Sequence, residues 1–107
     1  MSQVTTHVFD SALGRPAAGI DVLLMDAGGV TIATGTTDEN GQVADLGPEQ
    51  LPAGDFRLVF DTGDYFAASS RPTFFPMVTI DFTLADPAAR YHVPLVLSPF
   101  AYSTSLG

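Results

Sequence analysis

Two histidines are the residues of this chain best suited to acid–base chemistry. His7 lies in the run VTTHVFD near the N-terminus, and His92 lies in the run YHVPLVLS near the C-terminus. Both runs alternate in the way that is typical of strands with one buried face. If the valine-rich set of each run is buried, both imidazoles point away from the core. Because imidazole changes its charge near neutral pH, an accessible pair of this kind could take a proton from water and so activate it.

A metal site is an alternative interpretation of the two histidines. Asp10 or Asp81 could in principle complete a ligand set with them, but no close spacing of His and Asp residues supports such a set. The sequence therefore predicts no metal site. A lone histidine in a strand is also commonly a plain surface residue, so the residues by themselves leave the catalytic role open.

Short strands separated by turns are expected to position these residues. One short helix is expected within residues 61–70, capped by Asp61 or Thr62 and stopped by Pro72 and Pro76. Pro94 inside a strand predicts a ladder that is not paired on both sides along its whole length. The expected strands are 4–10, 20–25, 30–36, 42–46, 56–61, 77–84, 91–98 and 100–104.

Glycine-rich turns join these strands. Ala27-Gly28-Gly29 predicts a hairpin between the second and third strands, and Asp38 to Gly41 predicts another turn. Residues 11–19 are expected to form a loop. The aromatic residues of the helical region are expected in the core, and they are Tyr65, Phe66, Phe74 and Phe75. Seven to eight short strands with one short helix predict an all-β class and a β-sandwich.

The composition limits the classes of partner. A chain of 107 residues predicts a single domain, 1–107, with a modest core. Four arginines and no lysine face twelve acidic residues, for a net charge of −8, which disfavours nucleic acid and anionic membranes as partners. No cysteine is present, and no apolar run approaches the roughly 18 residues of a spanning helix. We therefore expect a soluble, cytoplasmic protein without disulfides.

Three runs of the sequence resemble the 5-hydroxyisourate hydrolases, the transthyretin-related enzymes of urate breakdown. They are TTHVFDSALGRPA at 5–17, TFFPMVTIDF at 73–82 and YHVPLVLSPFAYST at 91–104, and their order and spacing also fit. The resemblance implies a transthyretin-like fold and a homotetramer of two dimers, with the sites in the channel where the dimers meet. It also implies the hydrolysis of 5-hydroxyisourate to 2-oxo-4-hydroxy-4-carboxy-5-ureidoimidazoline without a cofactor.

The same resemblance implies roles for individual residues. His7 within TTHVFD and His92 within YHVPL match the two histidines that, in this family, help to activate water and position the substrate. Gln42 stands where the family has an arginine after a turn glycine. Ser105-Leu106-Gly107 stands where the family continues Tyr-Arg-Gly-Ser. The residues expected to bind substrate are Gln42, Tyr102, Ser103, Thr104 and Ser105.

Gln42 and the altered C-terminal tetrapeptide keep a second function open. A glutamine still donates and accepts hydrogen bonds, but it supplies no fixed charge. Losing one charged donor costs on the order of a hundred- to a thousandfold in rate, so reduced activity is expected. None of the four arginines is an obvious replacement, and they are Arg15, Arg57, Arg71 and Arg90. The alternative is a transthyretin-like paralogue that binds a small aromatic or purine-like ligand without turnover. A third hypothesis is a purely structural oligomer.

Overall fold

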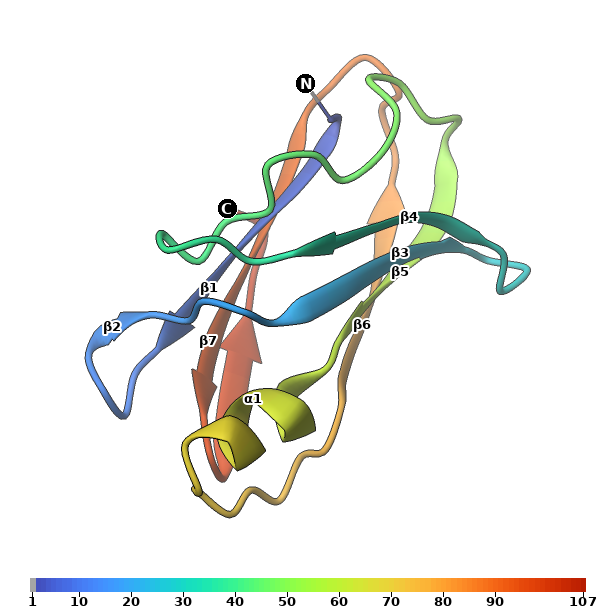
Figure 1. The fold of residues 1–107 in the computed structure, drawn as a ribbon. Coiled ribbons are helices and arrows are strands. Elements are labelled where there is room, and N and C mark those ends of the chain that lie inside the picture. Colours follow the sequence, from blue (N-terminus) through green and yellow to red (C-terminus); the bar gives the residue numbers. More distant parts are fainter. Residues whose placement is uncertain (1) are drawn as a thin grey trace.

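The fold is a β-sandwich of two four-stranded sheets with one short helix at one end (Figure 1). A computed structural model describes residues 2–107. The elements in chain order are β1 (Val4–Asp10), β2 (Arg15–Pro16), β3 (Asp21–Asp26), β4 (Thr31–Thr36), β5 (Gly54–Phe60), α1 (Thr62–Ala68), β6 (Val78–Leu84), β7 (Tyr91–Ser98) and β8 (Ala101–Thr104). The expected all-β sandwich is confirmed. Within the described residues, no helix is long and apolar enough to cross a membrane.

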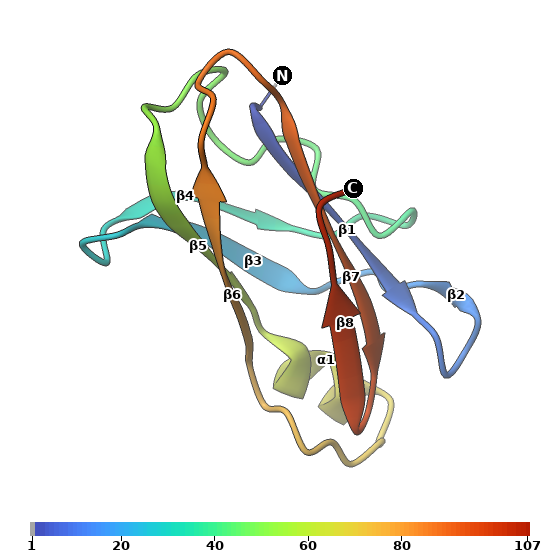
Figure 2. The same ribbon diagram turned by 180° about the vertical axis from the view of Figure 1, so that it is seen from behind.

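Sheet A has the strand order β2-β1-β7-β8, and sheet B has the order β4-β3-β5-β6. The two histidine-bearing strands, β1 and β7, are neighbours in sheet A and run parallel, with Val4 opposite Tyr91 and Asp10 opposite Leu97. The other paired strands run antiparallel. Figure 2 shows β1, β7 and β8 side by side in one layer. The opposite ends of the sequence therefore meet in the middle of sheet A.

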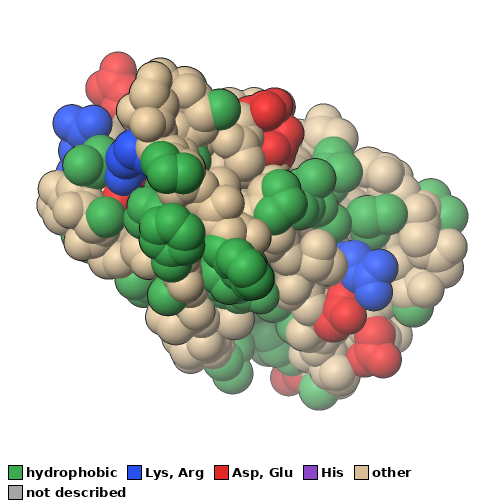
Figure 3. All heavy atoms as spheres, turned by 90° about the horizontal axis from the view of Figure 1, so that it is seen from below, with side chains coloured by type: hydrophobic (Ala, Val, Ile, Leu, Met, Phe, Trp, Pro, Cys, Tyr) green, Lys and Arg blue, Asp and Glu red, His purple; other side chains and the backbone are tan. Residues whose placement is uncertain are grey.

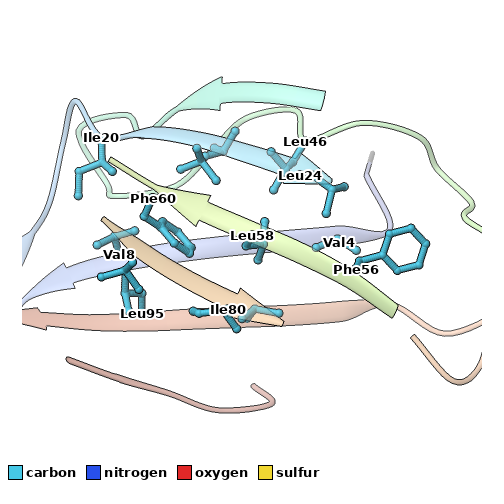
Figure 4. Packing of buried hydrophobic residues seen from close by; sticks show 14 of the residues in the cluster. Val4, Val8, Ile20, Leu24, Leu46, Phe56, Leu58, Phe60, Ile80 and Leu95 are labelled. Atoms are coloured by element: carbon cyan, nitrogen blue, oxygen red, sulfur yellow. The ribbon is translucent and has the colours of Figure 1, made fainter. Parts of the chain in front are cut away.

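The core lies between the two sheets and follows the predicted alternation. Val4 and Val8 on β1 and Leu95 on β7 are fully buried, together with Leu58 and Phe60 on β5. Figure 4 shows these side chains pointing into the space between the sheets. Because successive strand residues face opposite ways, burying this set turns the intervening residues of β1 and β7 outward. The predicted outward orientation of the histidines is therefore confirmed.

The helix and its cap also match the prediction. The Asp61 carboxylate accepts a hydrogen bond from the Asp64 backbone N–H at 3.3 Å, which satisfies one of the free donors of the first turn. Thr62 Oγ1 donates to the Phe75 carbonyl at 2.7 Å, and Phe66 is fully buried. These contacts hold α1 against the end of the sandwich.

Two local predictions are wrong, and a third is incomplete. Residues 42–46 form no strand, and only Gln42 makes an isolated bridge, which is to His7. Side chains satisfy the backbone of this segment in place of a ladder, since the Leu46 N–H donates to Ser2 Oγ at 2.7 Å. Phe74, expected in the core, is 73% exposed because its segment turns outward beside the β7–β8 turn. The loop expected at 11–19 also contains the two-residue strand β2, paired with the end of β1.

Pro94 confirms the expectation of an incompletely paired ladder. Pairing between β7 and β8 begins at Leu95, opposite Thr104, and extends to Ser98. Backbone groups of His92 and Pro94 face the β8 side, where the Gly107 N–H and Thr104 Oγ1 donate to their carbonyls. The missing N–H of Pro94 therefore lies just beyond the end of that ladder, where no strand partner requires it.

Candidate functional site

The outer face of sheet A brings together residues from both ends of the chain. We define this face by Thr5 and His7 on β1, His92 and Val96 on β7, and Ser103 on β8. The strand register places Thr5 opposite His92, and Val96 opposite Ser103. His7 lies opposite Pro94, so the two histidines are diagonal neighbours on adjacent strands. Long side chains in such diagonal positions are within reach of one another and of a shared ligand.

His92 is held by a side-chain hydrogen bond. Thr5 Oγ1 lies 2.9 Å from His92 Nδ1, and both residues are half-buried. The backbone of Gly107 packs along the same residue, because its N–H donates to the His92 carbonyl at 2.9 Å. A Cβ at Gly107 would lie only 3.0 Å from His92 Cδ2. The ring is therefore fixed on its Nδ1 side, and within residues 2–107 no hydrogen bond engages Nε2.

His7 has a different environment. No hydrogen bond to its ring is found in the described part of the chain, and the residue is half-buried. Gln42 lies opposite it through an isolated antiparallel bridge, so both side chains project from the same face. The Gln42 side chain is exposed. The imidazole of His7 and the amide of Gln42 are thus free to meet a ligand.

The turn before Gln42 brings it to β1. The Asp38 carboxylate accepts hydrogen bonds from the Asn40 and Gln42 backbone N–H groups at 2.9 and 3.0 Å. The Val8 N–H donates to the Gly41 carbonyl at 2.8 Å. Gly41 has a positive φ of 75°, and a Cβ there would collide with the Val8 carbonyl oxygen. Only glycine allows this close approach without strain.

The predicted substrate-binding residues of the C-terminal segment separate between two faces. Ser103 lies on the outer face with the histidines. Tyr102 and Thr104 lie opposite Leu97 and Leu95 and so share their side of the sheet. The Tyr102 ring packs edge-on against Phe75, with centroids 5.0 Å apart. Ser105 lines a groove of about 290 Å³ between β6 and the start of β7, together with Leu106, Phe82 and Tyr91.

No guanidinium is hydrogen-bonded to Gln42 or to either histidine within residues 2–107. Arg57 pairs with Asp81 at 2.6 Å on the exposed surface of sheet B, and Arg71 pairs with Asp10 at 2.7 Å. Arg90 donates from Nη1 to the Ser2 carbonyl at 3.5 Å. Arg15 is exposed on β2. Within the described residues, Gln42 thus has no arginine hydrogen-bonded to it.

The carboxylates considered as metal ligands are engaged elsewhere. Asp10 is fully buried on the core side of β1, opposite in direction to His7. It accepts hydrogen bonds from Tyr65 Oη and Arg71 Nη2, each at 2.7 Å. Asp81 belongs to sheet B and pairs with Arg57. Among the residues that the structure describes, no group of three or more His, Cys, Asp or Glu residues is arranged to hold a metal ion.

The pKa of the buried Asp10 carboxylate is shifted. Burial alone would raise the pKa of Asp10, but the hydrogen bonds from Arg71 and Tyr65 outweigh it and hold that pKa below its ordinary value. The pKa of Tyr65 is raised, first by burial and then by the bond to Asp10. This network ties the end of β1 to α1 and the segment after it. Sequence reasoning missed it, because Asp10 is separated from Tyr65 by 55 residues and from Arg71 by 61.

Sequence reasoning also missed Thr5. The parity of β1 puts Thr5 on the same face as His7, which was readable from the run TTHVF. Its contact with His92 depends on the parallel register of β1 and β7, which neither run specifies by itself. A second groove, of about 510 Å³, lies on sheet B and is lined by Asp26, Asp55, Arg57 and Asp81 among others. It contains none of the predicted site residues.

Comparison with known proteins places the chain in a family. Residues 4–107 match the "HIUase/Transthyretin family". The chain is 40% identical over 108 residues to a 5-hydroxyisourate hydrolase of Salmonella dublin, covering 97% of this chain and 79% of that protein.

Solved structures agree with that match. A 5-hydroxyisourate hydrolase of Klebsiella pneumoniae superposes with a TM-score of 0.90 at 34% identity, covering 100% of this chain and 94% of the other. Sea bream transthyretin in complex with thyroxine gives a TM-score of 0.90 at 32% identity, covering 98% and 94%. The fold, the matched residues and these relatives agree, and the chain belongs to the HIUase/Transthyretin family.

Proposed function

We propose that this protein hydrolyses 5-hydroxyisourate to 2-oxo-4-hydroxy-4-carboxy-5-ureidoimidazoline on the outer face of sheet A. The observation that carries the proposal is the meeting of His7 and His92 on one accessible face, although 84 residues separate them in the sequence. The hydrolases among the relatives support the choice of substrate. His7, His92 and Gln42 are the residues to which we assign the chemistry.

The site offers the groups that the reaction needs. His92 Nε2 takes a proton from a water molecule, whose oxygen forms a bond to the ring carbonyl carbon. His7 and Gln42 donate to the oxygen on which negative charge develops. The ring C–N bond then breaks, the proton returns from His92 to the leaving nitrogen, and the carboxylic acid that forms releases its remaining proton to solvent as the carboxylate of the product. Ser103 lies on the same face and is placed to contact the substrate ring. Tyr102 and Thr104 lie on the other side of the sheet, and Ser105 lines the groove beside Tyr91, so we propose no direct substrate contact for them within one chain.

Gln42 sets the expected level of activity. Its amide can donate one hydrogen bond to the developing charge, but it brings no positive charge. We therefore expect turnover on the order of a hundred- to a thousandfold below that of a site with a guanidinium at this position. No cofactor is required, because water supplies the nucleophile and His92 carries the proton from it to the leaving nitrogen.

We also propose that the active form is a homotetramer of two dimers. The four residues of β8 are all exposed, and β8 is an edge strand whose open side could pair with a second copy. Two outer faces of sheet A meeting across a channel would enclose the histidines and exclude bulk water. Sedimentation should then give four times the 11.2 kDa of one chain, and a monomer at working concentration would contradict this assembly.

The alternative is a transthyretin-like protein that binds a small aromatic or purine-like ligand in the same channel without turnover. The likeness to sea bream transthyretin in complex with thyroxine and the missing guanidinium at Gln42 are the observations that favour it.

Histidine substitutions distinguish these functions. 5-Hydroxyisourate is generated from urate with urate oxidase, and its ultraviolet decay is followed with wild type, His7→Ala and His92→Ala. For a hydrolase, removing the general base should lower kcat by about a hundredfold or more, and folding should be unchanged by circular dichroism. Calorimetric binding of urate without any accelerated decay would favour the binding alternative. If the protein neither binds urate nor accelerates the decay, the result would favour a purely structural oligomer.

A further inference from the structure

We infer that Thr5 is a positioning residue, which accepts a hydrogen bond from His92 Nδ1–H and thereby leaves the Nε2 lone pair as the base. The contact between Thr5 Oγ1 and His92 Nδ1 is 2.9 Å, within the range of a good hydrogen bond. The kinetic part of this inference rests on the proposed hydrolase function. The tautomer of His92 does not depend on that function.

The backbone fixes both partners of this contact. Thr5 and His92 lie directly opposite each other in the parallel ladder of β1 and β7, in the interior of sheet A. Thr5 is β-branched, which restricts its χ1 rotamers and suits a strand. The Gly107 backbone packs against the other side of the His92 ring. The imidazole is therefore held between the Thr5 hydroxyl and the C-terminal segment.

The direction of the hydrogen bond decides what His92 can do. In a neutral imidazole, one nitrogen carries the proton and the other the lone pair. If the hydroxyl donated to Nδ1, Nε2 would carry the proton and could not take one from water. If Nδ1–H donates to Oγ1, Nε2 presents its lone pair to the outer face. Thr5 is only half-buried, so its own hydroxyl proton can be directed to solvent.

This arrangement separates the roles of the two histidines. The His92 ring is oriented by a partner, as a general base usually is. The His7 ring has no such partner within the described residues, and it lies beside the free Gln42 amide. A rotatable, uncommitted imidazole suits substrate contact better than a fixed proton transfer. We therefore assign the proton transfer to His92 and the ligand contact to His7.

Nuclear magnetic resonance tests the inference without any turnover. Protein labelled with ¹⁵N-histidine has only two imidazoles, and a His7→Gln variant assigns them. The ring ¹⁵N shifts of His92 above its titration range should show the Nδ1–H tautomer in wild type and in Thr5→Ser, which keeps the hydroxyl. In Thr5→Val, which keeps the shape but loses the acceptor, the Nε2–H tautomer should gain population. An Nε2–H tautomer in wild type, or no change in Thr5→Val, would overturn the inference.

Kinetics supply the second readout. Thr5→Val should lower kcat on the order of tenfold to a hundredfold with little change in KM, and Thr5→Ser should restore it. Thr6→Val is the matched control, because Thr6 Oγ1 donates to the Val93 carbonyl on the core side of the same strand. Equal loss of kcat in Thr5→Val and Thr6→Val would show a merely structural role. Absence of turnover in wild type would defeat the proposed function and leave the tautomer test intact.

Discussion

Gln42 is the residue of the proposed site that is neutral where a positive charge is expected. The bridge to His7 places its amide beside the imidazole, so the position is right for a ligand contact even though the charge is absent. The chain has only four arginines, and two of them are tied to carboxylates away from this face. In the site that we propose, the position of Gln42 therefore carries no charge to stabilise a developing oxyanion.

Restoring the charge should raise activity. We expect Gln42→Arg to increase kcat/KM for 5-hydroxyisourate on the order of a hundredfold, because the side chain is exposed and has room for a guanidinium. Initial rates of ultraviolet decay measure the change. Gln50→Arg is the matched control, since it adds the same charge at another exposed glutamine. An equal gain in both variants would reveal general electrostatic attraction, and no gain in either would exclude Gln42 from the site.

The orientation of a side chain could be predicted from the sequence wherever the alternation of a strand decided it. His7 and His92 point outward because Val4, Val8 and Leu95 are buried. Contacts between residues of different strands were not predictable in this way. The bond between Thr5 and His92 needs the parallel register, and a shift of one residue would turn every side chain to the other face.

At the scale of elements, the turn from Asp38 to Gln42 brings Gln42 to His7 on the outer face of sheet A. The turn was predicted from its composition, and the Asp38 carboxylate stabilises it as expected for an Asx turn. The strand predicted after it does not form, because Ser2 Oγ satisfies the Leu46 N–H across the structure. A short run such as QVADL cannot reveal such a distant partner.

Gly41→Ala should displace this turn. The new Cβ would collide with the Val8 carbonyl oxygen, and the positive φ would add strain, so unfolding should become easier by about 2–4 kcal/mol. Urea denaturation measures the loss. Gly29→Ala is the control, because Gly29 also has a positive φ of 84° but a Cβ there would meet nothing within 4 Å. Similar losses in the two variants would contradict the importance of the close approach to β1.

At the scale of the whole molecule, the Asp10–Arg71 ion pair connects sheet A to the segment after α1. Arg71 reaches Asp10 from the segment after α1, and its guanidinium carbon lies 4.9 Å from the centre of the Phe66 ring. Figure 3 shows the end of the molecule below this region, where hydrophobic side chains gather on the surface. Phe74 and Phe100 are 73% and 66% exposed, and the Phe74 N–H donates to Pro99 in the β7–β8 turn. The network thus anchors a segment that carries exposed aromatic surface.

Asp10→Asn should weaken the fold in a pH-dependent way. It leaves the Arg71 guanidinium without its counter-charge, at a cost of about 3 kcal/mol at neutral pH, the lower end for a buried pair because Arg71 is partly exposed. Because the pKa of folded Asp10 lies below its ordinary value of 3.8, the stabilisation is complete above that value. It is lost as the pH falls through the folded pKa.

The difference between wild type and Asp10→Asn should therefore shrink as the pH falls below about 4. Urea midpoints measured from pH 7 to pH 2.5 would show it. Asp81→Asn breaks an exposed Arg–Asp pair and should leave the midpoint nearly unchanged. A loss for Asp10→Asn that is constant over the whole range would contradict the role of the carboxylate charge.

The sandwich itself was predictable, because alternation within each strand reports burial directly. The Asp10 network and the exposure of Phe74 were not, since both depend on how the segment after α1 returns to sheet A. The candidate site, too, was predictable only in part. Its histidines follow from strand parity, while its positioning contacts follow from the way the strands meet.

The most direct test of the central claim is the decay rate of freshly generated 5-hydroxyisourate as a function of protein concentration. If the outer face of sheet A is a hydrolase site, the rate should rise above the spontaneous decay in proportion to wild-type protein. The double variant His7→Ala/His92→Ala should return it to the spontaneous value. Decay that stays at the spontaneous rate with folded wild-type protein, or that the double variant accelerates equally, would contradict the proposed function.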